Sequence, residues 1–146
     1  MFDARLFRHD LHRHPEIGFD LPRTKARVAE VLRDLGCEVQ TGTGVLGILK
    51  AGTGNRAIGL RADMDALPIA ETGTHDHVSQ TPGAMHACGH DGHTAMLLAA
   101  AARLAEARDF DGTVVFLFQP NEEHGLGAQA MLDEGVLERF PVDEVY

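Results

Sequence analysis

The chain has 146 residues, a formal net charge of −9 at pH 7 and 44% hydrophobic residues. This length is sufficient for one globular domain with a buried core. The negative charge argues against a nucleic-acid or anionic-membrane partner, and the longest apolar run, 95–102, is too short to cross a bilayer. The first twenty residues lack a signal-peptide pattern. We therefore expect a cytoplasmic protein without membrane association, in which Cys37 and Cys88 stay reduced.

Two helices are predicted in the first quarter of the chain. Residues 3–13 have apolar positions near one face, and Pro15 follows as a natural stop. A second helix is expected with Asp20 as its cap, Pro22 in its first turn and Gly36 after its end. Its apolar positions recur at helical spacing: Val28, Val31, Leu32 and Leu35.

The rest of the chain alternates between strands and helices. Strands are predicted at 37–40, 45–50, 57–61, 113–118 and 142–146, and glycine-rich turns separate the first three. Helices are predicted at 94–107 and around 128–132. Because the run 113–118 is continuously apolar, we expect it to be covered on both faces of a sheet. This order predicts a layered α/β domain with its polar residues of interest at strand ends and in loops.

The segment 86–93, HACGHDGH, combines three imidazoles with a thiol, and both groups are preferred zinc ligands. If the segment is extended, Cys88 and His90 point the same way and converge on one ion. Asp91 then either caps the following helix or orients His90. A lone histidine is most often structural, but three within eight residues favour a metal site.

Two acidic motifs follow predicted strands. In the segment 119–123, QPNEE, one of the adjacent glutamates Glu122 and Glu123 can bind a metal while the other acts as a general base. A solvated acidic turn is the alternative. Asp63 and Asp65 are spaced to ligate a metal or to hold a ligand's histidine, although surface loops share this pattern. Together these residues indicate metal-assisted hydrolysis of an amide or ester, but they do not identify the substrate.

Four segments, LHRHPE at 11–16, RADMDALP at 61–68, HACGHDGH at 86–93 and QPNEE at 119–123, occur in the order found in one family. The chain resembles the amidohydrolase branch of the dinuclear metallopeptidases, which includes hippurate hydrolases, N-acyl-amino-acid amidohydrolases and auxin-conjugate hydrolases. The resemblance implies a layered α/β/α, zinc-exopeptidase-like catalytic domain, with residues 1–146 as its N-terminal part.

The resemblance also implies roles for individual residues. Cys88, His90 and Glu123 match metal ligands, and Glu122 matches the general acid/base that activates metal-bound water. The complete site would hold two divalent ions, with zinc, manganese, cobalt and nickel as candidates. Second-shell or substrate-contacting positions are expected at Asp63, Asp65, Asp91 and His93. His124 stands where a small residue is expected, so it either narrows the pocket or adds a ligand.

Family members continue with further histidine ligands and a lid and dimerisation domain, so an incomplete domain without these parts is expected here. The activity implied is hydrolysis of N-acyl amino acids (hippurate-like) to a free amino acid and a carboxylic acid, by enzymes that are often homodimers. One alternative is a truncated, inactive fragment that at most binds a divalent metal. Another is a structural zinc site in an interaction module, which would require four closed ligands.

Overall fold

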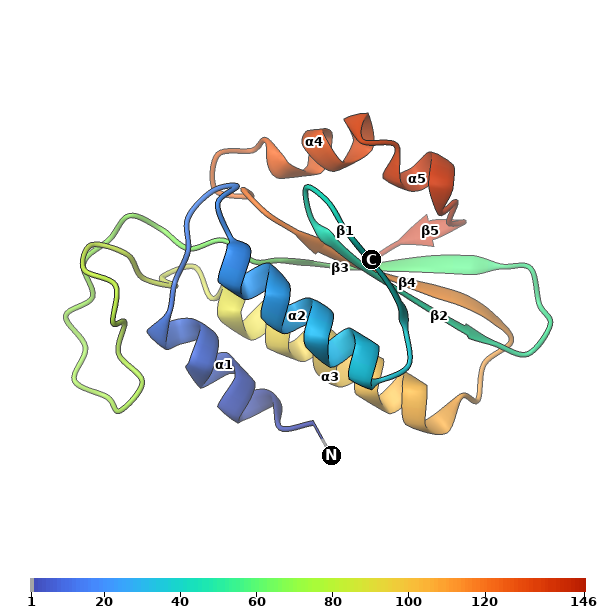
Figure 1. Cartoon of the computed structure of the whole chain (residues 1–146), viewed down its shortest axis with the longest axis horizontal. Helices are drawn as coiled ribbons and strands as arrows, with labels where there is room; N and C mark the ends of the chain where they lie inside the picture. Colours follow the sequence, from blue (N-terminus) through green and yellow to red (C-terminus); the bar gives the residue numbers. More distant parts are fainter. Residues whose placement is uncertain (1) are drawn as a thin grey trace.

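The computed structural model describes residues 2–146. This part of the chain forms a five-stranded sheet in the order β1-β2-β4-β3-β5, with five helices packed on its two faces. In Figure 1, α1, α2 and α3 cover one face, and α4 and α5 cover the other. The layered α/β fold predicted from the alternating elements is confirmed.

The sheet is mixed. Its strands are β1 (Glu38–Thr41), β2 (Val45–Ala51), β3 (Ala57–Asp63), β4 (Gly112–Gln119) and β5 (Glu144–Val145). β2 pairs antiparallel with both β1 and β4, whereas β3 lies parallel to β4 and β5. Asp63 and Gln119 are register partners at the carboxyl ends of β3 and β4. The residues that follow these two strands therefore leave the sheet at the same edge.

Apolar side chains fix the helices to the sheet. The helices are α1 (Ala4–Arg13), α2 (Pro22–Asp34), α3 (His90–Ala107), α4 (Gly127–Asp133) and α5 (Val136–Arg139). The larger core lies between the first three helices and the sheet, with Leu11, Leu32, Leu98 and Phe116 fully buried. A smaller core under α4 and α5 contains Met131 and Val136. β4 contributes to both, as expected for a strand covered on both faces.

The local predictions differ from the structure at helix starts. α2 begins at Pro22 with Leu21 as its N-cap, so the cap predicted at Asp20 is wrong; Gly36 after the helix has the expected positive φ of 77°. α3 begins at His90, four residues before the predicted start, because Gly89 takes a left-handed conformation with φ of 87°. Cys88 and His90 are therefore not neighbours on one face of an extended segment, and that part of the prediction is wrong.

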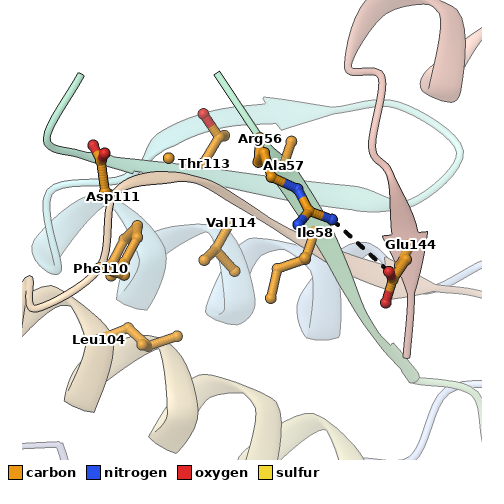
Figure 2. A pocket seen from close by; sticks show the side chains of 10 residues that line it. Arg56, Ala57, Ile58, Leu104, Phe110, Asp111, Thr113, Val114 and Glu144 are labelled. Carbon is orange, nitrogen blue, oxygen red and sulfur yellow. Dashed lines mark ion pairs between the residues drawn. The ribbon is translucent and has the colours of Figure 1, made fainter. Parts of the chain in front are cut away.

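A cavity of about 420 Å³ lies at the amino ends of β3 and β4, at the opposite end of the sheet from Cys88 and His90. Figure 2 shows its lining from the amino ends of β3 and β4, including Ile58 and Val114, with Leu104 from the end of α3. Arg56 and Glu144 face each other across one side. The cavity is mainly apolar, and its lining includes none of the predicted metal ligands Cys88, His90 and Glu123. Among residues 2–146, no helix is both long and apolar enough to cross a membrane.

Candidate metal centre

Three segments meet at the carboxyl edge of β3 and β4: the end of β3, the start of α3 and the turn after β4. His90, only 2% exposed, lies at their centre. Its Nε2 atom is 3.6 Å from Glu122 Oε2, 3.8 Å from Glu123 Oε1 and 3.7 Å from Asp63 Oδ1. The parallel pairing of β3 with β4 thus gathers side chains that are far apart in the sequence.

Cys88, His90 and Glu123 each offer one ligand atom, and these atoms lie within 4.8 Å of one another. Thiolate, imidazole and carboxylate are all established zinc ligands. Cys88 is exposed and Glu123 is partly exposed, so the group opens to solvent on one side. The three residues predicted as metal ligands are therefore close enough to share one ion.

Asp65 orients His90. The Nδ1 atom of His90 lies 2.8 Å from the backbone carbonyl oxygen of Asp65 and 3.4 Å from its carboxylate. Because a carbonyl oxygen can only accept a hydrogen bond, Nδ1 carries the proton and donates it. The Nε2 atom is then available toward Glu122 and Glu123, which is the arrangement of a metal-binding histidine.

The Asp65 carboxylate also holds the turn that carries the two glutamates. It accepts hydrogen bonds from the backbone amides of Glu122 at 3.0 Å and Glu123 at 3.2 Å. Burial opposes ionisation of Asp65, but His90 and these two amides hold the pKa of its carboxyl below the usual range. Asp65 is therefore a buried carboxylate that connects the metal-capable histidine with the acidic turn.

The electrostatics of this group favour a cation. Burial opposes protonation of His90, yet Asp65 and Asp63 raise its pKa. Partial loss of solvent around the sulfur, and then the carboxylate of Glu123, raise the pKa of the Cys88 thiol. Glu123 Oε1 is buried without a hydrogen-bond partner among the described residues. A divalent ion would balance the clustered carboxylates and give this oxygen a partner, so the residues present fit such an ion.

Comparison with known proteins agrees with this geometry. The sequence profile of the peptidase family M20/M25/M40 matches residues 59–146, more than half of the chain. The chain belongs to this family.

The chain is similar to named enzymes of the family over part of their length. It is 48% identical to hippurate hydrolase from Campylobacter jejuni, covering 95% of this chain and 37% of the relative. It is 43% identical to N-acyl-L-amino acid amidohydrolase from Geobacillus stearothermophilus, covering 96% of this chain and 39% of the relative. The chain thus spans less than two fifths of these relatives. The resemblance to the amidohydrolase branch is confirmed.

Solved structures share the fold closely. A dinuclear metal binding peptidase of the M20 family from Bacillus subtilis superimposes with a TM-score of 0.92 at 38% identity, over 97% of this chain and 41% of that one. A protein described as a putative aminohydrolase, from methicillin-resistant Staphylococcus aureus, gives a TM-score of 0.91 at 41% identity, over 97% and 39%. The sequence comparison and the structure comparison thus agree that the chain has the M20-family fold.

Asp63 and His93 lie beside the central group. Asp63 Oδ1 is 2.8 Å from His93 Nδ1, and Asp63 Oδ2 is 2.9 Å from Arg61. Asp63, His90 and His93 form a second metal-capable group, which shares His90 with the first. In this member of the M20 family, both residues are thus near the proposed ligands, with Asp63 already paired to a cation.

Asp91 faces away from this group. Its carboxylate lies 2.7 Å from His12 Nδ1 and 3.1 Å from Arg8 Nε, both on α1. The N-cap of α3 is Gly89, so the predicted capping role for Asp91 is wrong. His124 Nδ1 lies 2.5 Å from Asn121 Oδ1 within the same turn, and the two roles expected for His124 stay predictions.

Sequence reasoning missed a second group of histidines next to α1. His12 meets Glu71 and His75, and these three again offer ligand atoms within 4.8 Å. Nearby His86 is 4% exposed, and burial lowers its pKa to about 4. His12 and Glu71 are separated by 59 residues, so their sequence spacing carries no ligand signal. The sequence signal for this group was the pair of nearby histidines, His75 and His77.

Proposed function

We propose that this chain is part of the catalytic domain of an M20-family amidohydrolase that cleaves N-acyl amino acids, hippurate-like substrates among them. The products would be a free amino acid and a carboxylic acid. The observation that carries the proposal is the meeting of Cys88, His90 and Glu123 beside Glu122. The activities named for the similar enzymes, hydrolysis of hippurate and of N-acyl-L-amino acids, support the substrate class.

Three side chains would hold a divalent ion: Cys88 through Sγ, His90 through Nε2 and Glu123 through Oε1. When bound, the ion supplies a Lewis acid that polarises the amide carbonyl and lowers the pKa of water. We infer two ions in the complete site, drawn from zinc, manganese, cobalt or nickel, in keeping with the dinuclear structure from Bacillus subtilis. We also infer a cytoplasmic location, where the exposed Cys88 thiol stays reduced.

Glu122 would be the general acid/base. Its side chain is 41% exposed and its Oε2 atom lies 3.6 Å from His90 Nε2, so it borders the ion without a tight hydrogen bond. It would take a proton from the attacking water and deliver it to the amide nitrogen as the C–N bond breaks. Asp65 would keep Glu122 in place through the backbone amide.

A matched pair of variants of the complete natural protein tests these roles. Glu122→Gln should lower kcat for N-acyl amino acid hydrolysis by roughly 10²–10⁴-fold while the bound metal stays unchanged. Glu123→Gln should instead lower the metal content, because it replaces a charged ligand. Chelation should abolish turnover of a panel of N-acyl amino acids, and added divalent metal should restore it.

Turnover that survives both chelation and Glu122→Gln would exclude this function. Gln129→Glu, an exposed change on α4, serves as the control and should affect neither kcat nor metal content. Loss of metal together with loss of activity in Glu122→Gln would show that Glu122 is a ligand rather than the acid/base.

A further inference from the structure

A third cluster of metal-capable side chains lies between α1 and the loop after β3. It consists of His12 on α1 and Glu71, His75 and His77 on the loop, and we call these four residues the loop cluster. It shares no residue with the Cys88, His90 and Glu123 group. It therefore requires an explanation apart from amide hydrolysis.

One distance in the loop cluster is close to that of a tetrahedral metal site. Glu71 Oε1 lies 2.7 Å from His75 Nε2 and 3.2 Å from His12 Nε2. Zinc bonds of about 2.0–2.1 Å at tetrahedral angles separate ligand atoms by ~3.3 Å. The His12–Glu71 separation is close to this value, and the ligand atoms of His12, Glu71 and His75 all lie within 4.8 Å of one another. The exposed His75 would move away from Glu71 to share an ion with it.

Two of these ligands are held in place by neighbours. His12 is 4% exposed, and its Nδ1 atom lies 2.7 Å from the buried Asp91 carboxylate. This leaves His12 Nε2 directed at Glu71, in the carboxylate–histidine arrangement that commonly supports a metal ligand. Glu71 is also anchored, because its Oε2 atom accepts a hydrogen bond of 2.6 Å from the Ser79 backbone amide. Its other oxygen remains directed at the two histidines.

The histidines crowd together in a way that protonated rings would disfavour. The ring centroids of His75 and His77 are 4.0 Å apart, and His9 stacks on His77 at 3.7 Å. Charged imidazolium rings at these separations repel one another. Neutral rings that share a divalent ion avoid this repulsion, since a metal ligand must be deprotonated.

Access for an ion is also present. A surface hollow of about 480 Å³ is lined by His9, His75 and His77 together with residues of α1. The His75 side chain is 39% exposed, so an incoming ion can reach it from solvent. Anchored ligands on the inner side and an exposed ligand on the outer side are a suitable arrangement for reversible binding.

We propose that His12, Glu71 and His75 form an additional site for a divalent transition-metal ion, with the His77 ring packed against the ring of His75. Imidazole with carboxylate suits zinc, nickel and copper(II) rather than magnesium or calcium. The site is independent of the proposed amidohydrolase activity.

Zinc titration by calorimetry tests the site, with Zn²⁺ alone as the probe. The background is the Cys88→Ser/His93→Ala/Glu123→Gln protein, in which both metal-capable groups that contain His90 are disabled. This background should bind zinc at the loop cluster, and adding His75→Ala and His77→Ala should weaken that binding at least tenfold. His14→Ala removes a histidine that follows α1 and whose ring contacts Asp10 on that helix, and it should leave zinc binding unchanged.

Equal zinc affinity and stoichiometry with and without His75 and His77 would overturn the site. A similar loss in the His14→Ala control would also overturn it, because the binding would then be non-specific. His75 is exposed in a loop, so circular dichroism should show the same fold for the variants. His75→Gln gives a second, milder variant that removes the imidazole while retaining a polar side chain, and it should weaken zinc binding in the same direction.

Discussion

The Nδ1 atom of His90 lies 2.8 Å from the backbone carbonyl oxygen of Asp65. This contact joins the first residue of α3 to the segment that follows β3. The same Asp65 uses its carboxylate to hold the backbone amides of Glu122 and Glu123 after β4. One buried residue thus sets the relative position of three chain segments, which makes it the natural place to disturb the metal centre without removing a ligand.

We expect Asp65→Asn to weaken zinc binding by the Cys88, His90 and Glu123 group about 10–100-fold. The asparagine side chain keeps the size of aspartate. It has only one accepting oxygen, however, and its amide group would face the backbone N–H groups of the turn. His90 and Glu123 would then lose their fixed orientation. Competition between the protein and a chelating dye for zinc measures the change.

Asp133→Asn is the matched control for this substitution. Asp133 is exposed at the end of α4 and accepts a hydrogen bond from Gln129 there. Its replacement should leave zinc affinity unchanged. Equal zinc affinity for wild type and Asp65→Asn would contradict an orienting role for Asp65.

Removal of metal should change the reactivity of one cysteine and leave the other unaffected. Cys88 is exposed, whereas Cys37 is 8% exposed and burial raises the pKa of its thiol. After chelation, an alkylating reagent should modify Cys88 and leave Cys37 intact until the protein unfolds. Added zinc should slow modification of Cys88 at least tenfold, as measured by mass spectrometry of the alkylated peptides.

Glu123→Gln provides the internal comparison, because a weakened site should give Cys88 less protection at the same zinc concentration. Alkylation of Cys88 at one rate with and without zinc would show that its thiol does not bind the ion. Cys37 becomes accessible when the protein unfolds. Alkylation of Cys37 in the same sample therefore shows whether modification of Cys88 results from denaturation.

The elements predicted best are those with a strong apolar pattern. The run 113–118 lies inside β4 and is buried on both faces, as its continuous apolar character indicates. The predicted helix 94–107 lies inside α3, but its true start at His90 depends on the left-handed Gly89. α5, with four residues, was not predicted, because so short a helix has too few positions to show a period.

The candidate ligands could be named from the sequence, but their geometry could not. Cys88, His90 and Glu123 meet because β3 and β4 are parallel neighbours, a tertiary fact that local spacing does not contain. The contact between His12 and Asp91 joins residues 79 positions apart and was missed for the same reason. Residue type thus indicated the metal chemistry, whereas the pairing of strands decided which side chains share a site.

Core packing under the candidate site predicts a large loss of stability in Leu98→Ala. Leu98 is fully buried in α3 and packs in the larger core. Its truncation should lower the free energy of unfolding by about 3 kcal/mol through lost burial and the remaining cavity. Met96→Ala, two residues away and 62% exposed, should change it by less than about 0.5 kcal/mol. Urea denaturation measures both, and similar losses would mean that Leu98 is not a core residue.

Two opposing effects decide the stability of Gly127→Ala: the higher helix propensity of alanine and the steric overlap of its Cβ atom. Gly127 is the first residue of α4, and alanine in a helix is favoured over glycine by about 1 kcal/mol. A Cβ atom there would, however, overlap the carbonyl oxygen of Pro120, and this backbone cannot move without shifting the turn that carries Glu123. Because overlap outweighs propensity, we expect a loss of about 2–3 kcal/mol in unfolding free energy together with weaker zinc binding.

Gly92→Ala is the comparison that separates the two effects. Gly92 lies in the first turn of α3, where an added Cβ would meet only Arg8 Nε at 3.8 Å, an ordinary contact. Its replacement should therefore raise the free energy of unfolding by about 0.5–1 kcal/mol. If Gly127→Ala is also stabilising and retains its zinc affinity, the turn after β4 can relax away from α4. The position of Glu123 would then not depend on the close approach of Gly127 to Pro120.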